Sequence, residues 1–599
     1  MAKTSKSKKK PNTYLPGFSP ERDAWFAAFL IENHLDHITH PDHAVPPEQV
    51  RFMVYLEEDE RYYPCSNRMF EAIMSRKKSQ FLQAKYRQVL NRIMALIANQ
   101  IEDEKERQYL EALIKIKYEH ETRDQIMIPS RLEKRLIRIF LDRTQIEDPY
   151  LYEKTLRNYR ADKVLKSDAF KTALNHVGHS ALKRSPRSLS ALRGLTDQIV
   201  IQRLFSLTVE NSLWESDDAE KCTMKDYLEI FKKSLTGNGV RPLIQFLGLH
   251  DEYTGRDQGK RILWLANESG EVIMDLAIIK YLTKLGHKII IAFKEGPLFT
   301  KVDFYDAQGD DTLKRELEGS LLIEDENLSK NKLVNTLKSH YSIIVISDGT
   351  RENLNLLLAS TTFARMFKEV DGIISRGDDQ KRRFFDSQFQ FTQDIFNISG
   401  SETGAVNIAY KQKHPAVIKF SHEDLEKKAK TITEQMTAAK KKGMTVVFYS
   451  GIIGSIPGKV KTAKQIMAVF VEHLKEQSAM TYIINPSEYF EPGMDADDLM
   501  YMWEIVQRSG LIDIWRFQTY EDIAKAFELL KSKVPPEWVG KDATFSTGCT
   551  KEMKIALEVQ EDHPEMQIIG PSKEKFMRRK EYGIGKMYDQ RLGEVIRQP

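Results

Sequence analysis

The first third of the chain repeats apolar residues at the spacing of amphipathic helices. Stretches such as FLQAKYRQVLNRIMALIANQ place apolar side chains three and four positions apart, which lines one face of a helix. Proline and glycine residues interrupt the pattern and divide it into about six to eight expected helices. We therefore predict an all-helical region over residues 19–248, preceded by a solvated basic tail over residues 1–18.

After residue 248 the pattern changes to short apolar runs that alternate with amphipathic segments. Four of these runs are RILWLAN, KIIIAFK, YSIIVISDG and DGIISRGD, and each leads into a polar loop. The alternation is typical of an open sheet of parallel strands with helices on its faces. Ligands bind such sheets beyond the carboxyl ends of the strands, so we expect the four loops to lie along one edge. The loops begin at Ala266, Lys294, Ser347 and Ser375.

A second strand and helix series follows a charged helix in SHEDLEKKAKTITEQMTAAKKKG. Its expected strands are MTVVFYSG, TYIINP, LIDIWRF, ATFSTG and MQIIGP. The two series do not repeat one another, so the sequence does not indicate an internal duplication. The predicted fold class is α/β. The helical region precedes a doubly wound, mostly parallel α/β domain over residues 249–435 and a second, Rossmann-like α/β domain over residues 436–599.

Composition and charge exclude several classes of protein. Of the 599 residues, 41% are hydrophobic, which suffices to offset chain entropy and excludes a collagenous or wholly disordered chain. No apolar run approaches the ~18 residues that cross a bilayer, and 90 basic against 86 acidic residues give a net charge of only +4. We therefore predict no membrane or DNA partner. Three widely separated cysteines form neither a disulfide framework nor a zinc motif, which favours a cytoplasmic protein.

Four motifs carry the candidate chemistry. In chain order they are EDPYLYEKTLRN, LANESGEVIMD, KEGPLFTKVDFYDA and DGIISRGDDQ. Over residues 130–420 their order and spacing resemble the metal-dependent damage-control phosphatases, also called the acidic-residue methyltransferase-like family. The resemblance implies a site at the strand ends for a phosphorylated small metabolite and a divalent metal, Mn²⁺, Mg²⁺, Co²⁺ or Ni²⁺. Such a metal polarises the phosphoryl oxygens while water attacks in line.

The sequence departs from the family pattern at the expected metal ligands. The family's first aspartate corresponds to Ala266, and Lys301 stands four residues beyond Pro297, where the family has a second acidic ligand. Of the three ligands only Asn267 remains. Because a divalent metal repels an ammonium, we expect Lys301 to take the metal's place and to bind a phosphate directly as a fixed charge.

The other residues of the site take their expected roles from the same resemblance. Asn267, Glu271 and Asp275 are the candidate catalytic residues, and Glu271 and Asp275 are expected to orient the loop. The candidate substrate-binding residues are Lys294, Lys301, Arg376 and Gly377.

Three functions remain open from the sequence. The first is binding of a phosphorylated small metabolite, with or without its dephosphorylation and with or without a metal cofactor. The second is an active metal-dependent phosphatase, in which Asn267 and Asp303 act as ligands or Glu268, Asp303 and Asp306 rebuild the metal site. The third is a catalytically dead scaffold that binds a protein partner through the helical region and the C-terminal domain.

The second α/β series has its own glycine loops at strand-to-helix junctions. The segment GIIGSIPGKVKT is not a nucleotide-binding P-loop, because Ile453 stands where a glycine is needed and Val460 where Ser or Thr is needed. Backbone N–H groups in these loops are candidates for anion binding, and tight turns with Ser or Thr caps are the alternative. The candidate residues are Gly454, Ser455, Gly458, Lys459, Ser546, Thr547 and Gly548.

Two further features have a structural and a functional interpretation. The histidines at positions 34, 37, 40 and 43 form a cluster in which His34 and His37 are expected one turn apart on a helix. They are either exposed polar residues at a helix end or a transition-metal site. Cys549 follows a glycine at an expected helix start, which would lower the pKa of its thiol, and a buried inert thiol is the alternative.

Overall fold

The structure is a computed structural model of the chain, and its described residues form two compact units, Met1–Pro415 and Ala416–Pro599. Residues 1–16 and 18 of the expected basic tail lie outside the described part. No described helix combines the length and the apolar character that a membrane crossing requires. The structure describes residues 17, 19–57, 60–75, 79–176, 189–249, 259–401, 404–456, 459–489 and 491–578.

Helices dominate the first unit up to residue 249, as the apolar spacing predicts. They outnumber the expected six to eight because several are single turns, such as α2 and α10. Serine caps start many of them: Ser66 and Ser79 each accept a backbone N–H at the first turn of α3 and α4. The helices are α1 (Pro20–Glu32), α2 (Pro47–Val50), α3 (Asn67–Met74), α4 (Gln80–Gln100), α5 (Glu104–Thr122), α6 (Pro129–Thr144), α7 (Leu151–Lys166), α8 (Asp168–Asn175), α9 (Leu189–Leu207), α10 (Ser212–Glu215), α11 (Met224–Ile230) and α12 (Val240–Phe246).

The helical region is not separate from the sheet that follows it. Two-residue strands within it, β1 (Val54–Tyr55) and β2 (Leu235–Thr236), pair with β8 (Gln390–Phe391) and with β10, respectively. Helices and sheet therefore belong to one compact unit.

The central sheet has eight strands in the order β2-β10-β9-β7-β3-β4-β6-β5. All neighbouring strands are parallel except β9 and β10, which confirms a mostly parallel α/β fold. The chain leaves β3 toward β4 on one side and later returns to β7 on the other, so the order reverses between β3 and β7. The strands are β3 (Arg261–Leu265), β4 (Lys288–Phe293), β5 (Leu321–Ile323), β6 (Ile343–Ser347), β7 (Gly372–Arg376), β9 (Ile395–Gly400) and β10 (Val406–Lys411).

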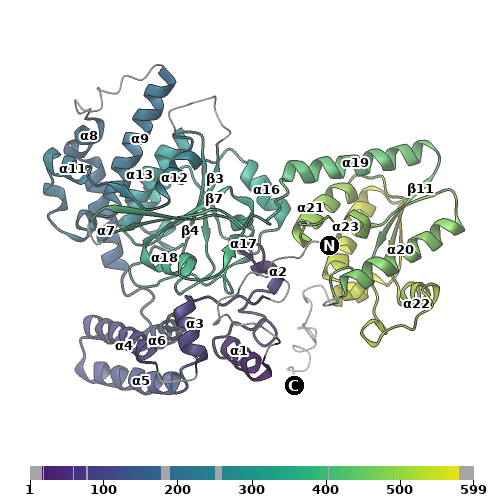
Figure 1. Cartoon of the computed structure of the whole chain (residues 1–599), viewed down its shortest axis with the longest axis horizontal. Helices are drawn as coiled ribbons and strands as arrows, with labels where there is room; N and C mark the ends of the chain where they lie inside the picture. Colours follow the sequence, from purple (N-terminus) through teal and green to yellow (C-terminus); the bar gives the residue numbers. More distant parts are fainter. Residues whose placement is uncertain are drawn as a thin grey trace, which may run out of the picture. The chain divides into compact units, whose positions relative to one another are not determined.

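Helices cover both faces of this sheet because its strands are apolar on both sides. In β3, Leu263 and Leu265 join one hydrophobic core and Ile262 and Trp264 join the other, as the two-residue period of a strand requires. Figure 1 shows α12 and α13 on one face and α17 and α18 on the opposite face. The helices that connect the strands are α13 (Glu271–Lys284), α14 (Asp306–Gly309), α15 (Asp311–Glu316), α16 (Lys330–Lys338), α17 (Thr361–Glu369) and α18 (Gly377–Phe385).

The second unit contains a smaller, all-parallel sheet with the strand order β12-β11-β13-β14. It begins before the expected boundary at residue 436, because α19 packs against α21 and β11 of this unit. Its elements are α19 (His422–Lys441), β11 (Thr445–Ser450), α20 (Val460–Gln477), β12 (Thr481–Ile484), α21 (Ala496–Gln507), β13 (Ile514–Phe517), α22 (Tyr520–Leu529), α23 (Thr547–Asp562), β14 (Gln567–Ile569) and α24 (Lys573–Arg578).

One expected strand of the second unit is wrong. The segment ATFSTG forms a 3-10 turn over Ala543–Phe545 and then the start of α23. The side chain of Asp542 accepts the N–H of Thr544, and the hydroxyl of Ser546 accepts the N–H of Cys549. These two caps favour a turn followed by a helix over an extended strand.

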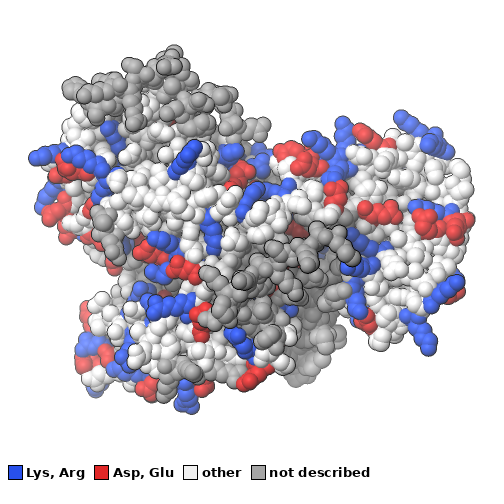
Figure 2. Space-filling view, in the orientation of Figure 1, with Lys and Arg blue, Asp and Glu red and all other residues white. Residues whose placement is uncertain are grey.

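Charged residues of both signs are interspersed on the face of the molecule drawn in Figure 2. This distribution agrees with the near-balanced charge of the sequence. Any recognition by charge therefore depends on local groups.

Candidate functional site

The candidate site lies beyond the carboxyl ends of β3 and β7, where the strand order reverses. In open α/β sheets this reversal creates the crevice that binds ligands. Asn267 follows β3, and its backbone carbonyl accepts the N–H of Val302 from the loop after β4. Glu268 and Lys301 form an antiparallel backbone bridge beside it. This pairing of two loops fixes Lys301 next to Asn267.

Lys301 makes the central contact of the site. Its Nζ donates to Oδ1 of Asn267 at 2.6 Å and to Oε1 of Glu268 at 2.9 Å. Asp379 of α18 lies 3.7 Å from the same ammonium. Burial lowers the pKa of Lys301, but the carboxylates of Glu268 and Asp379 outweigh burial and hold the pKa above its usual value. The ammonium is therefore charged and paired.

Little space remains around this contact. The cavity between Ala266, Asn267, Lys294 and Lys301 measures about 10 Å³. A cavity of this size holds one water molecule at most. The centre is closed by the side chains of the chain itself.

These residues do not fit a divalent metal. Ala266 offers no ligand atom, and the side-chain oxygens of Asn267 and Glu268 already accept hydrogen bonds from Lys301. A metal needs several free oxygen ligands, and it is repelled by a nearby ammonium. The expected contact between Lys301 and Asn267 is present. The lysine ammonium lies at the position where the family pattern would hold a divalent metal.

Arg376 is placed differently from the expected phosphate ligand. Its guanidinium is fully buried and donates to Glu271 at 2.7 Å and to Asp275 at 3.0 Å. It also donates to the carbonyl groups of Ile398 at 2.9 Å and Thr208 at 3.0 Å. Arg376 therefore faces the core and ties β7, β9 and the helical region to α13. Glu271 and Asp275 pair with it there.

Asp275 belongs to the core rather than to an open site. It is fully buried at the first turns of α13 and accepts the indole N–H of Trp264 at 2.9 Å. Burial is the main cause that raises the pKa of Asp275 to about 7; Arg376 opposes this rise and the neighbouring Glu271 adds to it. Glu271 also accepts a hydrogen bond from Nδ2 of Asn267 at 2.9 Å, so it orients that side chain.

Gly377 makes the close approach of β7 to the Asn267 loop possible. Its φ is +77°, and a Cβ at this position would lie 2.8 Å from Nδ2 of Asn267. Both the backbone conformation and the space require glycine.

Lys294 is buried at the end of β4, and its ammonium group is hydrogen-bonded to neighbouring oxygens. Its Nζ donates to Asp348, to the hydroxyl of Thr350 at 3.0 Å and to the carbonyl of Glu352 at 2.8 Å. Burial lowers the pKa of Lys294, while Asp348 acts in the opposite direction. The expected role in substrate binding would require this lysine to exchange one of these partners.

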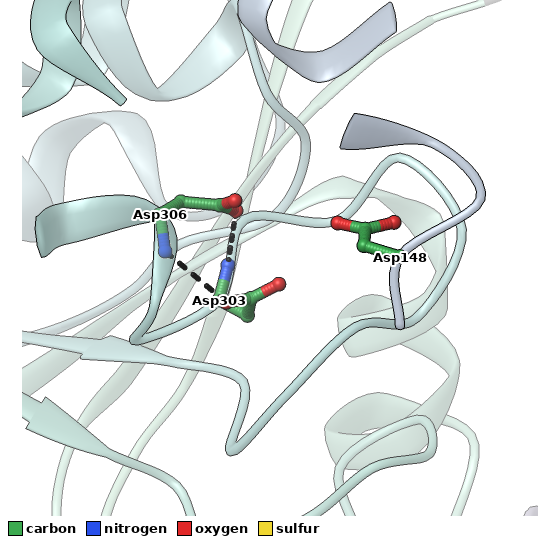
Figure 3. Close-up of side chains that lie close together, drawn as sticks. All are labelled: Asp148, Asp303 and Asp306. Atoms are coloured by element: carbon green, nitrogen blue, oxygen red, sulfur yellow. Dashed lines mark hydrogen bonds between the residues drawn. The ribbon is translucent and has the colours of Figure 1, made fainter. Parts of the chain in front are cut away.

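A second group of acids lies beside the centre, at Asp148, Asp303 and Asp306 (Figure 3). In the described part of the chain this is the one group of three acidic, histidine or cysteine side chains with ligand atoms within 4.8 Å of one another. Asp303 and Asp306 each accept the other's backbone N–H, at 3.2 and 2.8 Å. The carboxylate of Asp303, a candidate metal ligand with Asn267, thus takes part in this second group.

Lys154 of α7 provides the cation for these acids. Its Nζ lies 2.8 Å from Asp148, 2.6 Å from Asp303 and 2.7 Å from Asp306. The pKa of Asp306 is raised to about 7, mainly by burial and also by the neighbouring Asp303, against the opposing effect of Lys154. The three carboxylates offer enough oxygen ligands for a divalent cation, but the Lys154 ammonium already occupies the position between them.

Sequence reasoning missed the role of Lys154, although a signal exists in the motif EDPYLYEKTLRN. Lys154 and Asn158 are four residues apart, on one face of α7. Asn158 accepts the backbone N–H of Gly270 at 2.7 Å. Helix α7 packs against α13, so two buried polar residues one turn apart on α7 indicate contacts with the loops beside α13.

In the second unit the candidate anion loops contain mainly helix caps and ion pairs. The hydroxyl of Ser546 caps α23, whose first two residues are Thr547 and Gly548. Lys459 pairs with Glu537 at 2.7 Å. Gly454 and the buried Ser455 lie in the loop after β11, and Gly458 lies outside the described residues.

The thiol of Cys549 is buried and donates to the carbonyl of Gly451 at 3.3 Å. Burial raises the pKa of Cys549 well above its usual value, and the carboxyl group of Glu552 adds to this effect. The structure therefore supports the inert-thiol interpretation.

The histidine cluster forms by ring stacking. The rings of His34 and His40 stack with centroids 4.3 Å apart, and His43 lies 6.3 Å from His34. Helix α1 ends at Glu32, so His34 and His37 follow the helix instead of lying one turn apart on it. Within the described chain these histidines do not form a group of three ligand atoms that could hold a metal.

A comparison with protein families agrees with the motifs. A family model described as the damage-control phosphatase ARMT1-like domain matches residues 81–428, which is more than half of the chain. Among solved structures, the chain is similar to a DUF89 family protein from Pyrococcus horikoshii, with 16% identity and a TM-score of 0.38. That alignment covers 55% of this chain and 98% of the other. No curated protein matches the chain.

Proposed function

The chain belongs to the family of the damage-control phosphatase ARMT1-like domain, and from this premise we propose that it binds a phosphorylated small molecule without a divalent metal and without metal-dependent hydrolysis. The proposed binding region is the carboxyl edge of the central sheet, where ligands of open α/β sheets bind.

The contact between Lys301 and Asn267 carries the proposal. Its length of 2.6 Å leaves no room for an ion between the two groups. At an effective dielectric of 20, a divalent ion about 4 Å from an ammonium would be repelled by roughly 8 kcal/mol, twice the value for two unit charges. The Lewis acid that would activate water is therefore excluded unless Lys301 moves away.

An active phosphatase with relocated ligands has less support. Its ligands would come from Glu268, Asp303 and Asp306, yet Glu268 pairs with Lys301 and the two aspartates pair with Lys154. Each candidate cation position thus contains a lysine ammonium. A metal would have to displace a paired, buried charge to bind at either place.

A larger cavity at the same sheet edge supports ligand binding. It measures about 370 Å³ and is lined by loop residues that follow β4, β5 and β6. This volume falls within the range of about 300–1,000 Å³ typical of small-molecule sites. The scaffold hypothesis does not require such a cavity.

Two measurements test the proposal. The first is hydrolysis of p-nitrophenyl phosphate and glycerol 3-phosphate with Mg²⁺, Mn²⁺, Co²⁺ or Ni²⁺, with Asn267→Ala as the comparison. We expect no metal-stimulated turnover above that of the variant. The second is thermal stability in EDTA with glycerol 3-phosphate, which should stabilise by about 2.7 kcal/mol at one hundred times its dissociation constant.

The outcomes separate the three functions. Metal-stimulated turnover that Asn267→Ala abolishes would establish the active phosphatase and contradict the proposal. Absence of both turnover and stabilisation with every phosphate ester would favour the scaffold.

A further inference from the structure

The cavity beyond β4, β5 and β6 differs from the closed centre in containing a lysine, Lys134, that has no ion-pair partner in the described part of the chain. Loop residues after the three strands form its floor, and α6 together with residues 41–46 forms its other wall. Glu295, Glu326 and Gly349 lie two or three residues beyond the ends of β4, β5 and β6. The cavity is thus at the carboxyl edge of the sheet, where all three strands point the same way.

Lys134 is the key group of this cavity. It lies half-buried on α6 and forms no hydrogen bond or ion pair with another described residue. Burial lowers the pKa of its ammonium, and Glu352 and Glu295 act in the opposite direction. Lys154, Lys294 and Lys301, in contrast, are each held by two or more acceptors. A partly buried ammonium without an internal partner is stabilised when an anion binds to it.

Two further basic side chains line the cavity together with Lys134. Arg131 lines the cavity one helical turn from Lys134 and pairs with Glu352. His43 also lines the cavity. The pKa of His34, in the same histidine cluster, is lowered to about 4 by burial and by nearby cations that include Arg135 and Arg131. Burial is the largest cause of this lowered pKa, and His34 is not among the residues that line the cavity.

Three acids also line the cavity, and one of them, Glu295, is paired with Arg351 at 3.4 Å through one of its two oxygens. The carboxylates of Glu295 and Glu326 lie in its wall, and Asp42 lies at the same surface. Burial raises the pKa of Glu326 and the nearby Glu295 raises it further, so the two acids are close enough to interact. Acceptors of this kind are best satisfied by hydroxyl or N–H donors of a ligand.

We propose that this cavity is the ligand site of the chain and that it takes a small molecule with one anionic group and several hydroxyl groups. Lys134 binds the anionic group, and the carboxylates of Glu295 and Glu326 accept hydrogen bonds from the hydroxyl groups. This inference rests on the proposed function and adds the location and the chemical class of the ligand. The closed Lys301 centre then has no direct contact with the ligand.

The test is calorimetric titration of the full chain in EDTA with three probes: glycerol 3-phosphate, inorganic phosphate and glycerol. Glycerol 3-phosphate should bind more tightly than inorganic phosphate, and glycerol should not bind measurably. Lys134→Met keeps the aliphatic stem and removes the charge, and it should weaken the binding of both phosphates by about tenfold or more. Lys134→Arg should stay within about threefold of the wild type.

Two further variants complete the test: one controls for an effect on folding, and the other tests the hydroxyl contacts. Arg138→Ala changes an exposed residue on the same helix and should bind like the wild type. Glu295→Gln should weaken glycerol 3-phosphate relative to inorganic phosphate, because it removes a charged acceptor for a hydroxyl group.

The outcomes distinguish this inference from the proposed function. If the wild type binds phosphates and Lys134→Met binds them equally well, the location is wrong while the proposed function stands. If the wild type binds neither phosphate, both are overturned. Equal affinity for glycerol 3-phosphate and inorganic phosphate in the wild type would contradict the hydroxyl contacts.

Discussion

Beyond β3 and β7 the carboxyl edge of the central sheet is closed, whereas beyond β4 and β6 it opens into a cavity. In the closed part, Lys301 and Lys154 are each surrounded by two or three oxygens at 2.6–2.9 Å. In the open part, Lys134 has no such partner among the residues that the structure describes. The same scaffold thus contains paired buried cations that contribute to the fold and an unpaired cation that is available to a ligand.

The comparison predicts that removing a paired lysine is costly. Lys154→Ala leaves three neighbouring carboxylates without a cation, so we expect a loss of about 3–5 kcal/mol in the free energy of unfolding, measured with urea in EDTA. Because the three acids then suit a divalent ion, excess Mn²⁺ should restore part of the loss. Lys163→Ala, an exposed position on the same helix, is the control. A loss below 1 kcal/mol would show that the acids are not dependent on Lys154.

A buried acid without a cation extends the comparison to the second unit. Glu552 on α23 accepts a hydrogen bond from Gln507 at 3.1 Å, and burial raises its pKa to about 7. Between about pH 4.5 and pH 7 the folded state binds more protons than the unfolded state, so stability falls as the pH rises through this window. At about 1.4 kcal/mol per pKa unit the fall from this group is roughly 3 kcal/mol.

Glu552→Gln tests this pH dependence. Urea unfolding of the wild type and of the variant between pH 4.5 and 7.5 should give a flatter profile for the variant. Glu561→Gln, on the exposed side of the same helix, should keep the slope of the wild type. Parallel profiles for all three proteins would show that Glu552 is ionised in the folded state across the window.

Much of the fold follows from local patterns, whereas part of the site does not. The apolar runs of β3, β4, β6 and β7 are long enough for their pattern to predict a strand. Two-residue strands such as β1 and β2 are too short for this. The segment ATFSTG contains strand-favouring residues, and its caps decide otherwise. The fold class was therefore predictable, and the shortest pairings were not.

For the site, motif spacing predicts the contact of Lys301 with Asn267, because the two loops follow adjacent parallel strands. The burial of Arg376 has no such signal. An arginine at the end of a strand faces either the ligand or the core according to what packs on it, here Asp275 and the carbonyl of Thr208. Lys134 is likewise one basic residue among several on α6, and only tertiary packing distinguishes it.

The closed centre should become a metal site when its acids are restored. The double variant Ala266→Asp, Lys301→Asp places two carboxylates beside Asn267 and removes the ammonium. At one hundred times its dissociation constant Mn²⁺ should then stabilise the protein by about 2.7 kcal/mol in thermal unfolding. The single variant Ala266→Asp retains Lys301 and should not respond, because the ammonium still repels the ion. An equal response of the wild type would mean that Lys301 does not prevent metal binding.

The smallest effect on stability is expected at the open cavity. Lys134→Met removes a charge that has no internal partner and keeps the aliphatic stem, so the free energy of unfolding should change by less than about 1 kcal/mol or increase slightly. Lys301→Met, which leaves Glu268 unpaired in the closed centre, should lose more in the same urea titration. Groups that await a ligand do not contribute to stability in its absence, because their partner is not part of the chain. A loss at Lys134 as large as that at Lys301 would mean that Lys134 is a structural residue, and the distinction between the two parts of the sheet edge would fail.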